Sequence, residues 1–197
     1  MRFWWPLQNP GKDFYDQEYD MTGERNKQAL CWGSRQFLKD VKIGSGNLLD
    51  IGCCSGDFLD VAKNLRFDAW GIDIAKRSIA VARHSYGLKN VYGDSITEFN
   101  QRDNLPKFTV ITFFELIEHL DNPAEFMQEI KKRIKNNGYV VFSTPDQECF
   151  PGWHDTPPQH LLQWNEKAIR SFLASYGFKI IKVKREPMSY KYFMYIF

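Results

Sequence analysis

The sequence predicts an α/β fold whose doubly wound, mostly parallel sheet of seven strands ends in an antiparallel hairpin. Three observations support this prediction. Short apolar runs alternate with amphipathic segments of helical period, which is typical of successive β-α units. The run 108–114 is apolar and β-branched and suits a central strand that is buried on both faces. The last strands, 178–184 and 190–197, are too close for a helical crossover and should pair antiparallel.

Composition indicates a single domain. The chain has 197 residues, of which 43% are hydrophobic, and this is enough for a substantial core. We expect residues 1–42 to form an N-terminal cap segment and residues 43–197 to form the main body of the domain. The formal charge is only +2, from 26 basic and 24 acidic side chains, which argues against a nucleic-acid surface spread over the whole protein.

The cysteine spacing and the lengths of the apolar runs indicate the cellular compartment of the protein. Cys31, Cys53, Cys54 and Cys149 show no C-x-x-C spacing, so neither a disulfide framework nor a cysteine zinc site is indicated. The start of the chain is too short and too polar for a signal peptide, and no apolar run approaches the length of a membrane span. We therefore expect reduced thiols in a cytoplasmic protein without a membrane span.

The first elements precede the sheet. The aromatic and acidic stretch 14–19 belongs to the cap, and apolar residues such as Leu30 and Phe37 predict a helix over residues 24–40. The apolar run 48–51 then breaks into a loop of small residues and resumes as an amphipathic helix. This pattern predicts the first β-α unit of a parallel sheet.

The loop of this first unit suits close approach to a ligand. Gly52 and Gly56 let the backbone turn sharply, and the helix that follows presents unpaired N–H groups. A dinucleotide site would need G-x-G-x-x-G here, which the chain lacks. The acid Asp50 at the strand end suits a cationic ligand better than a pyrophosphate.

The remaining elements follow in order. We expect helices at 76–84, 123–137 and 165–176, and strands at 68–74, 90–95 and 139–143. Asn122, with Glu125 and with Pro123 at the first helical position, predicts one helix start. Asn165 predicts another, and Gly177 predicts the end of that helix.

The first loop resembles a known family. Asp50, Gly52 and Gly56 match the D-x-G-x-G-x-G loop of class I S-adenosylmethionine-dependent methyltransferases, with Cys54 at the place of the middle glycine. The resemblance implies the Rossmann-like methyltransferase fold, with residues 43–197 as the methyltransferase domain. It further implies that S-adenosylmethionine binds at Asp50, Gly52, Cys53, Cys54 and Gly56.

The next two strands end in acids. Asp73 lies about 20 residues after the glycine loop, at a strand end, where it can accept hydrogen bonds from both ribose hydroxyls. The resemblance implies that Ile74 lies against the adenine. It also implies that Asp94, in the pair Gly93-Asp94, contacts the adenine amino group, and that Ser95 belongs to the cofactor site.

The long apolar strand should lie beside the first, so Phe114 and Glu115 at its end face the cofactor. Glu115, Glu118 and His119 stand at i, i+3 and i+4, which places them on one face of a helical turn. With His160 they would form a metal site of two carboxylates and two imidazoles. This set resembles that of small-RNA 3′-terminal methyltransferases and implies a divalent ion such as Mg²⁺, which lowers the pKa of an acceptor hydroxyl. A hydrogen-bonded network is the alternative.

The segment 144–163 is long for a loop of a compact domain, which predicts a functional role as the wall of the substrate site. We expect Trp153 and His154 to contact the acceptor there. Tyr15 and Tyr19 of the cap are expected to close the site. The alternative for the two tyrosines is that they only anchor the terminal segment.

Methyl transfer to an oxygen needs a base, and histidine can accept a proton near neutral pH. His160 is the favoured catalytic residue and His119 the second candidate, which in the alternative only holds backbone groups at a helix start. The resemblance extends to ubiquinone-pathway O-methyltransferases and to sugar and small-metabolite methyltransferases, and implies O-methylation of a small molecule or sugar. The alternatives are a metal-dependent 2′-O-methyltransferase acting on an RNA 3′ end and a protein that binds S-adenosylmethionine without turnover.

Overall fold

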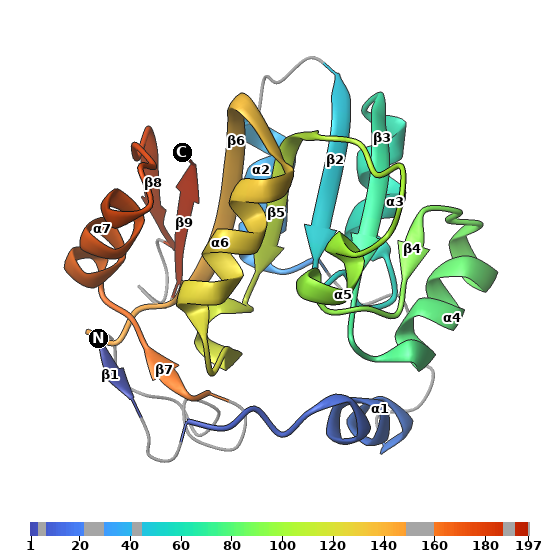
Figure 1. Cartoon of the computed structure of the whole chain (residues 1–197), viewed down its shortest axis with the longest axis horizontal. Coiled ribbons are helices and arrows are strands. Elements are labelled where there is room, and N and C mark those ends of the chain that lie inside the picture. Colours follow the sequence, from blue (N-terminus) through green and yellow to red (C-terminus); the bar gives the residue numbers. More distant parts are fainter. Residues whose placement is uncertain (4–6, 22–29, 41–44, 149–159, 187–191, 197) are drawn as a thin grey trace.

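A computed structural model describes residues 1–3, 7–21, 30–40, 45–148, 160–186 and 192–196. Its main sheet has the strand order β4-β3-β2-β5-β6-β9-β8 (Figure 1). The strands are β4 (Val91–Tyr92), β3 (Phe67–Ile72), β2 (Gly46–Ile51), β5 (Phe108–Phe114), β6 (Ile134–Pro145), β9 (Tyr192–Ile196) and β8 (Lys182–Arg185). The first five run parallel, and β9 is antiparallel to both of its neighbours. The predicted doubly wound, mostly parallel α/β fold with an antiparallel end is confirmed.

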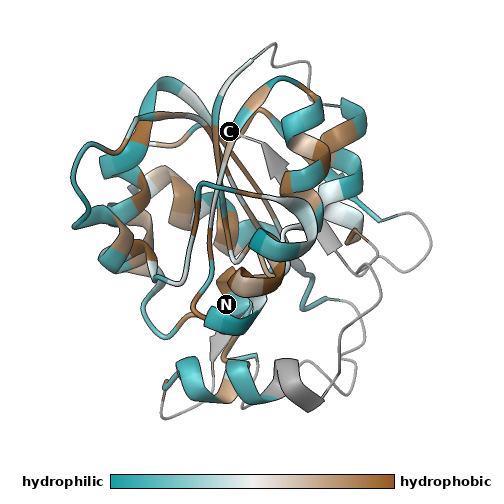
Figure 2. Ribbon diagram, turned by 90° about the vertical axis from the view of Figure 1, so that its right-hand side faces the viewer, coloured by the Kyte–Doolittle hydropathy of each residue, from teal (hydrophilic) through white to brown (hydrophobic). Residues whose placement is uncertain are grey.

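Helices cover both faces of the sheet. α2 (Trp32–Asp40), α3 (Asp57–Asn64) and α4 (Lys76–Tyr86) share one apolar cluster with the sheet. α5 (Ile96–Asn100), α6 (Pro123–Arg133) and α7 (Glu166–Ser175) share the other. In β5, Val110 points to the first cluster, whereas Ile111 and Phe113 point to the second, so this strand is buried on both faces as its sequence predicts. Figure 2 shows hydrophobic residues gathered along the central strands.

Local sequence signals place several helix ends. The Asn122 side chain accepts a hydrogen bond from the N–H of Glu125 at the start of α6. Asn165 accepts one from the N–H of Ala168 at the start of α7, and Gly177 follows that helix with a φ of +81°. These caps satisfy backbone N–H groups that a helix start leaves unpaired. Within the described part of the chain, no helix is both long and apolar enough to cross a membrane.

Two segments differ from the prediction. α6 ends at Arg133 rather than near residue 137, because Ile134 already pairs with Phe108 of β5 and begins β6. The cap stretch forms a helix, α1 (Lys12–Met21), and α2 covers only the end of the helix expected over 24–40. A small separate sheet, in which β1 (Arg2–Phe3) pairs antiparallel with β7 (Leu162–Gln163), has no local signal in the sequence.

The N-terminal segment lies along the edge of the sheet where β2, β3 and β5 end (Figure 1). Asn9 Nδ2 donates a hydrogen bond to the carbonyl oxygen of His119, at 2.8 Å. The Lys12 Nζ lies 2.6 Å from a carboxylate oxygen of Glu98 in α5. Asp16 Oδ1 accepts a bond of 3.2 Å from a backbone N–H in the first turn of α4. The segment is thus tied to three elements that surround the carboxyl edge of the sheet.

Gly71 of β3 lets α3 pack closely on the sheet, and replacing it should destabilise the fold. A Cβ at Gly71 would lie 2.8 Å from the Cys53 Sγ and would overlap Leu59. Because both neighbours are buried, we expect Gly71→Ala to lower the free energy of unfolding by about 1–3 kcal/mol. In the control Gly93→Ala, the new Cβ meets the flexible Lys76 side chain, which can move aside. Chemical denaturation of both variants tests this expectation, and equal losses would contradict it.

Candidate functional site

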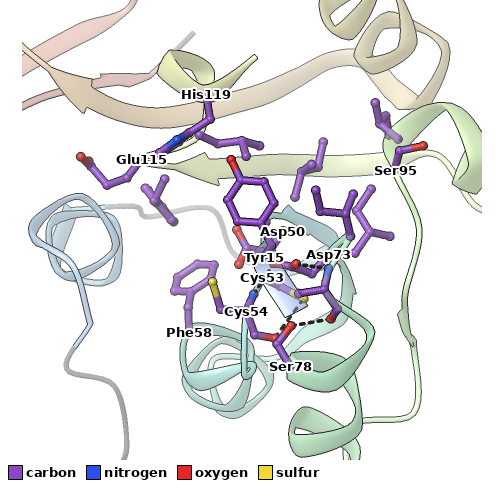
Figure 3. Close-up of a pocket in the computed structure, with 18 of the residues that line it drawn as sticks. Tyr15, Asp50, Cys53, Cys54, Phe58, Asp73, Ser78, Ser95, Glu115 and His119 are labelled. Carbon is purple, nitrogen blue, oxygen red and sulfur yellow. Dashed lines mark hydrogen bonds between the residues drawn. The ribbon is translucent and has the colours of Figure 1, made fainter. Parts of the chain in front are cut away.

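A cavity of about 570 Å³ opens at the carboxyl ends of β2, β3 and β5 (Figure 3). This is the place where doubly wound sheets bind ligands, and the size suits a small-molecule cofactor. Twelve of the residues predicted to form the site line it: Tyr15, Asp50, Gly52, Cys53, Cys54, Asp73, Ile74, Asp94, Ser95, Phe114, Glu115 and His119. These twelve residues, which extend over 104 positions of the sequence from Tyr15 to His119, therefore meet in one cavity.

The loop between β2 and α3 has left-handed backbone at three positions. Gly52 has a φ of +76° and Gly56 a φ of +84°, which glycine adopts without strain. Cys54 has a φ of +46°, which is uncommon for a residue with a Cβ. Gly56 does not line the cavity, and a Cβ there would lie 2.6 Å from the Leu88 side chain. Gly56 therefore serves the packing of α3 against α4.

Asp73, directly after β3, is held by the loop. Its Oδ2 accepts a hydrogen bond of 2.9 Å from the backbone N–H of Cys54, and its Oδ1 accepts one of 2.8 Å from that of Ala75. Burial raises the pKa of Asp73, and these bonds oppose that effect. Each carboxylate oxygen can accept a second bond, so the fixed carboxylate can still receive hydroxyl groups of a ligand.

Asp50, at the end of β2, is buried deeper. Thr112 Oγ1 of β5 donates a hydrogen bond of 2.6 Å to Asp50 Oδ1. The pKa of Asp50 is raised to about 7. Burial is the main cause and the charge of Asp73 adds to it, while the bond from Thr112 opposes both. A cation bound nearby would therefore stabilise the charged form of Asp50.

Asp94 and Ser95 lie on the side of α5. Ser95 is the N-cap of α5 and forms a capping box with Glu98, so its side chain accepts the Glu98 N–H while the Glu98 carboxylate accepts the Ser95 N–H. Asp94 Oδ2 accepts a hydrogen bond of 2.6 Å from Arg102 Nε. The apolar side chains of Ile74 and Ile96 line the same cavity. This end of the cavity combines an apolar lining with one anionic acceptor.

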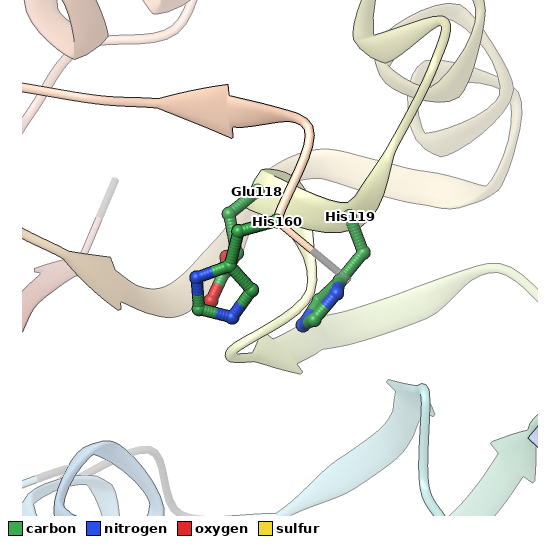
Figure 4. A group of neighbouring side chains, drawn as sticks. All are labelled: Glu118, His119 and His160. Carbon is green, nitrogen blue, oxygen red and sulfur yellow. The ribbon is translucent and has the colours of Figure 1, made fainter. Parts of the chain in front are cut away.

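Glu118, His119 and His160 form a compact group beside the cavity (Figure 4). One ligand atom of each lies within 4.8 Å of those of the others, and the two imidazole rings are 4.7 Å apart at their centroids. Glu118 is buried, and its carboxylate accepts a bond of 3.0 Å from Thr144 Oγ1. His119 lines the cavity, whereas Glu118 and His160 are not among the residues that line it.

The structure does not bring Glu115 into this group, contrary to the spacing argument. Only Ile117–His119 form a short helical turn, η1, and that turn is a 3-10 helix. Glu115 precedes it with a φ of +52°, and its carboxylate accepts a hydrogen bond from Ser143 Oγ. The i, i+4 rule requires continuous helix from Glu115 onward, which the left-handed residue prevents. The group therefore offers one carboxylate and two imidazoles.

Several expectations lie outside what the structure describes, and several lining residues were not anticipated. Trp153, His154 and the side chain of Tyr19 lie outside the described residues. The cavity is also lined by Asn9, Cys31, Ser34 and Ile96, among others. The S-x-x-E pattern of the α5 capping box was available in the sequence and would have placed Ile96 at a helix start next to the site. No local pattern marks Asn9 or Ser34.

Comparison with known proteins agrees with the sequence pattern. A family model described as a methyltransferase domain matches residues 22–183. A probable S-adenosylmethionine-dependent methyltransferase of Mycolicibacterium smegmatis is 26% identical over 170 residues, covering 81% of this chain and 65% of that protein. The ubiquinone biosynthesis O-methyltransferase of Aliivibrio fischeri is 32% identical over 144 residues, covering 72% of this chain and 57% of that protein. The chain thus spans less than two thirds of the length of these relatives.

Solved structures share the fold. A SAM-dependent methyltransferase from Archaeoglobus fulgidus has a TM-score of 0.69 at 18% identity, over 82% of this chain and 89% of that one. A complex of DhpI with SAH has a TM-score of 0.68 at 16% identity, over 93% of this chain and 92% of the other. At these identities the likeness establishes the fold alone.

Asp50 should make the stability of the protein depend on pH. Its usual pKa is 3.8 and its pKa in the folded protein is about 7. Between these values the folded state holds more protons, so the free energy of unfolding falls as pH rises from about 4 to 7. Asp50→Asn removes this loss, and at pH 8 we expect it to be more stable than the parent by roughly 4 kcal/mol.

Denaturation at a series of pH values measures the effect. Thr112→Val removes the bond that favours the charged carboxylate and should extend the loss to higher pH, because the loss still begins at the unfolded pKa near 3.8 but ends at a higher folded pKa. If the free energy of unfolding changes with pH in the same way in Asp50→Asn and in the unaltered protein, Asp50 is not the cause of the pH dependence.

Proposed function

Because the chain belongs to the methyltransferase domain family, we propose that it binds S-adenosylmethionine in the cavity and catalyses methyl transfer from it to an oxygen of a small molecule or sugar. The observation that carries the proposal is the pair of acids on either side of the glycine loop, the buried Asp50 and the half-buried Asp73, which both line the cavity. Asp50 suits the cationic end of this cofactor, and Asp73 suits its ribose hydroxyls. Asp94 would accept from the adenine amino group.

S-adenosylmethionine supplies an electrophilic methyl group, whose bond to sulfur breaks as a bond to the acceptor oxygen forms. The protein must orient the acceptor and take up its hydroxyl proton. His119 lines the cavity and would be placed to accept this proton, with His160 in ring contact behind it. This exchanges the roles expected from sequence, where His160 is the favoured base.

The acceptor class is supported by the relatives. The Aliivibrio fischeri relative is named as an O-methyltransferase of ubiquinone biosynthesis, which is chemistry on a hydroxyl of a small molecule. The cavity is lined by the aromatic side chains of Phe58 and Phe114, whose rings contact each other, which suits an acceptor with an apolar face. A binding protein without turnover is the rival, and methyl transfer from labelled cofactor to catechol and sugar acceptors distinguishes the two.

A second candidate, metal-assisted methyl transfer, is favoured by the group of Glu118, His119 and His160. A bound ion would lower the pKa of an acceptor hydroxyl as a Lewis acid. The donors fit a transition metal better than Mg²⁺, because two of the three are imidazoles and Mg²⁺ prefers oxygen ligands. Such an enzyme could act on vicinal hydroxyls, including those at an RNA 3′ end.

Cofactor binding tests the main proposal. We expect isothermal titration to detect S-adenosylhomocysteine binding, and Asp73→Asn to weaken it by about 10- to 100-fold, because a neutral amide accepts more weakly from ribose hydroxyls. Asp68→Asn is the matched control, since Asp68 lies on β3, the strand that Asp73 follows, but does not line the cavity. If the unaltered protein fails to bind, the proposed function is wrong.

Metal binding has its own test. In protein first stripped with a chelator, we expect Mn²⁺ at a hundredfold excess over its dissociation constant to raise the melting temperature by roughly 5–10 °C. His160→Gln should abolish the rise, whereas His84→Gln on the exposed face of α4 should keep it. If Mn²⁺ affects the His160→Gln and His84→Gln variants equally, the group does not bind the ion.

A further inference from the structure

Arg102 contacts Asp94, one of the residues that line the cavity. It follows α5, and its backbone N–H donates a bond of 3.0 Å to the carbonyl oxygen of Phe99. Its Nε lies 2.6 Å from Asp94 Oδ2, and Asp94 lines the cavity while Arg102 does not. The Asp94 side chain is only 16% exposed, whereas that of Arg102 is 43% exposed. Arg102 therefore reaches in from the surface to a carboxylate at the cavity wall.

The guanidinium of Arg102 also lies over an aromatic platform, which is formed by the rings of Tyr92 and Trp70. The Arg102 Cζ lies 4.4 Å from the centroid of the Tyr92 ring, which is a cation–π contact. Tyr92 in turn stacks on Trp70, with centroids 6.2 Å apart and 23° between the planes, and packs against Phe99. Because Tyr92 and Trp70 belong to β4 and β3, the platform is part of the sheet. Arg102 is thus held by two contacts, the carboxylate of Asp94 and the ring of Tyr92.

The ion pair leaves one side of Asp94 available. Among the described residues, Arg102 is the donor to Asp94, and the bond goes to Oδ2. The other oxygen, Oδ1, can accept from a ligand in the cavity. A carboxylate offers hydrogen-bond acceptors and no donor. It would bind an amino group and repel a carbonyl oxygen.

We propose that Arg102 is a positioning residue for base recognition, which fixes Asp94 so that the cavity selects a purine with an exocyclic amino group over one with a carbonyl oxygen. The inference rests on the proposed function, because it assumes that the adenosyl part of the cofactor lies at this end of the cavity. Arg102 acts through Asp94 and does not itself touch the ligand.

If Arg102 only stabilised the fold, its replacement would lower the melting temperature and leave the ligand selectivity unchanged. An exposed ion pair contributes little to stability, so the loss of Arg102 should leave the melting temperature close to that of the unaltered protein. Arg170 provides a matched control, since its Nε lies 2.8 Å from a carboxylate oxygen of Glu166 on α7. That pair has similar exposure and does not line the cavity.

The experiment measures selectivity rather than affinity alone. Dissociation constants are determined by isothermal titration for S-adenosylhomocysteine and for S-inosylhomocysteine, in which a carbonyl oxygen replaces the amino group. We expect the unaltered protein to prefer the adenosyl compound by about 100-fold, and Arg102→Gln to reduce this ratio by about tenfold. Arg102→Lys keeps the charge and should retain more of the ratio, and Arg170→Gln should retain all of it.

A double variant tests whether Arg102 acts through Asp94. If it does, Asp94→Asn combined with Arg102→Gln is no less selective than Asp94→Asn alone. Equal weakening of both ligands by Arg102→Gln, with the ratio preserved, would overturn the inference and leave the proposed function intact. If the unaltered protein binds neither ligand, the proposed function fails and the inference with it.

Discussion

The site depends on holding two carboxylates close together inside the protein. Asp50 pairs in register with Gly71 on one side and with Thr112 on the other, and Asp73 follows the same neighbouring strand two residues later. Parallel pairing therefore brings both acids to one edge of the sheet. Burial raises the pKa of both acids, and the charge of Asp73 also raises that of Asp50, so keeping both carboxylates charged at this edge costs free energy. An unfavourable arrangement that the fold maintains is typical of a functional site.

The surrounding structure fixes these acids through several independent contacts. Thr112 holds Asp50, and two backbone N–H groups of the loop and of the start of α4 hold Asp73. Gly71 allows α3 to approach closely enough for the loop to reach Asp73. Packing and polar contacts thus act together, because the loop that carries Cys54 is positioned by helix packing and then positions the carboxylate.

The sequence predicted those parts of the site that local patterns encode. The strand period, the two glycines and an acid at the end of each strand predicted that Asp50, Asp73 and Asp94 belong to one site. The prediction succeeds because the carboxyl ends of parallel strands share one edge of the sheet. It failed where the cause is distant along the chain. The pairing of β1 with β7 joins residues about 160 positions apart. Glu115 was misplaced because its left-handed backbone depends on contacts at the end of β5, which spacing alone does not reveal.

The partners of the three acids make the charge differ between the two ends of the cavity. Asp94 is neutralised by Arg102, whereas Asp50 and Asp73 are held by a hydroxyl and by backbone N–H groups, none of which is a cation. A ligand with one cationic end and one neutral end would therefore place the cation near Asp50, where it lowers the pKa of a carboxyl now near 7, and the neutral end near Asp94. S-adenosylmethionine has this polarity, with its sulfonium and ammonium at one end and its base at the other. The reverse orientation would leave Asp50 without a countercharge and place a cation beside a carboxylate that Arg102 already neutralises.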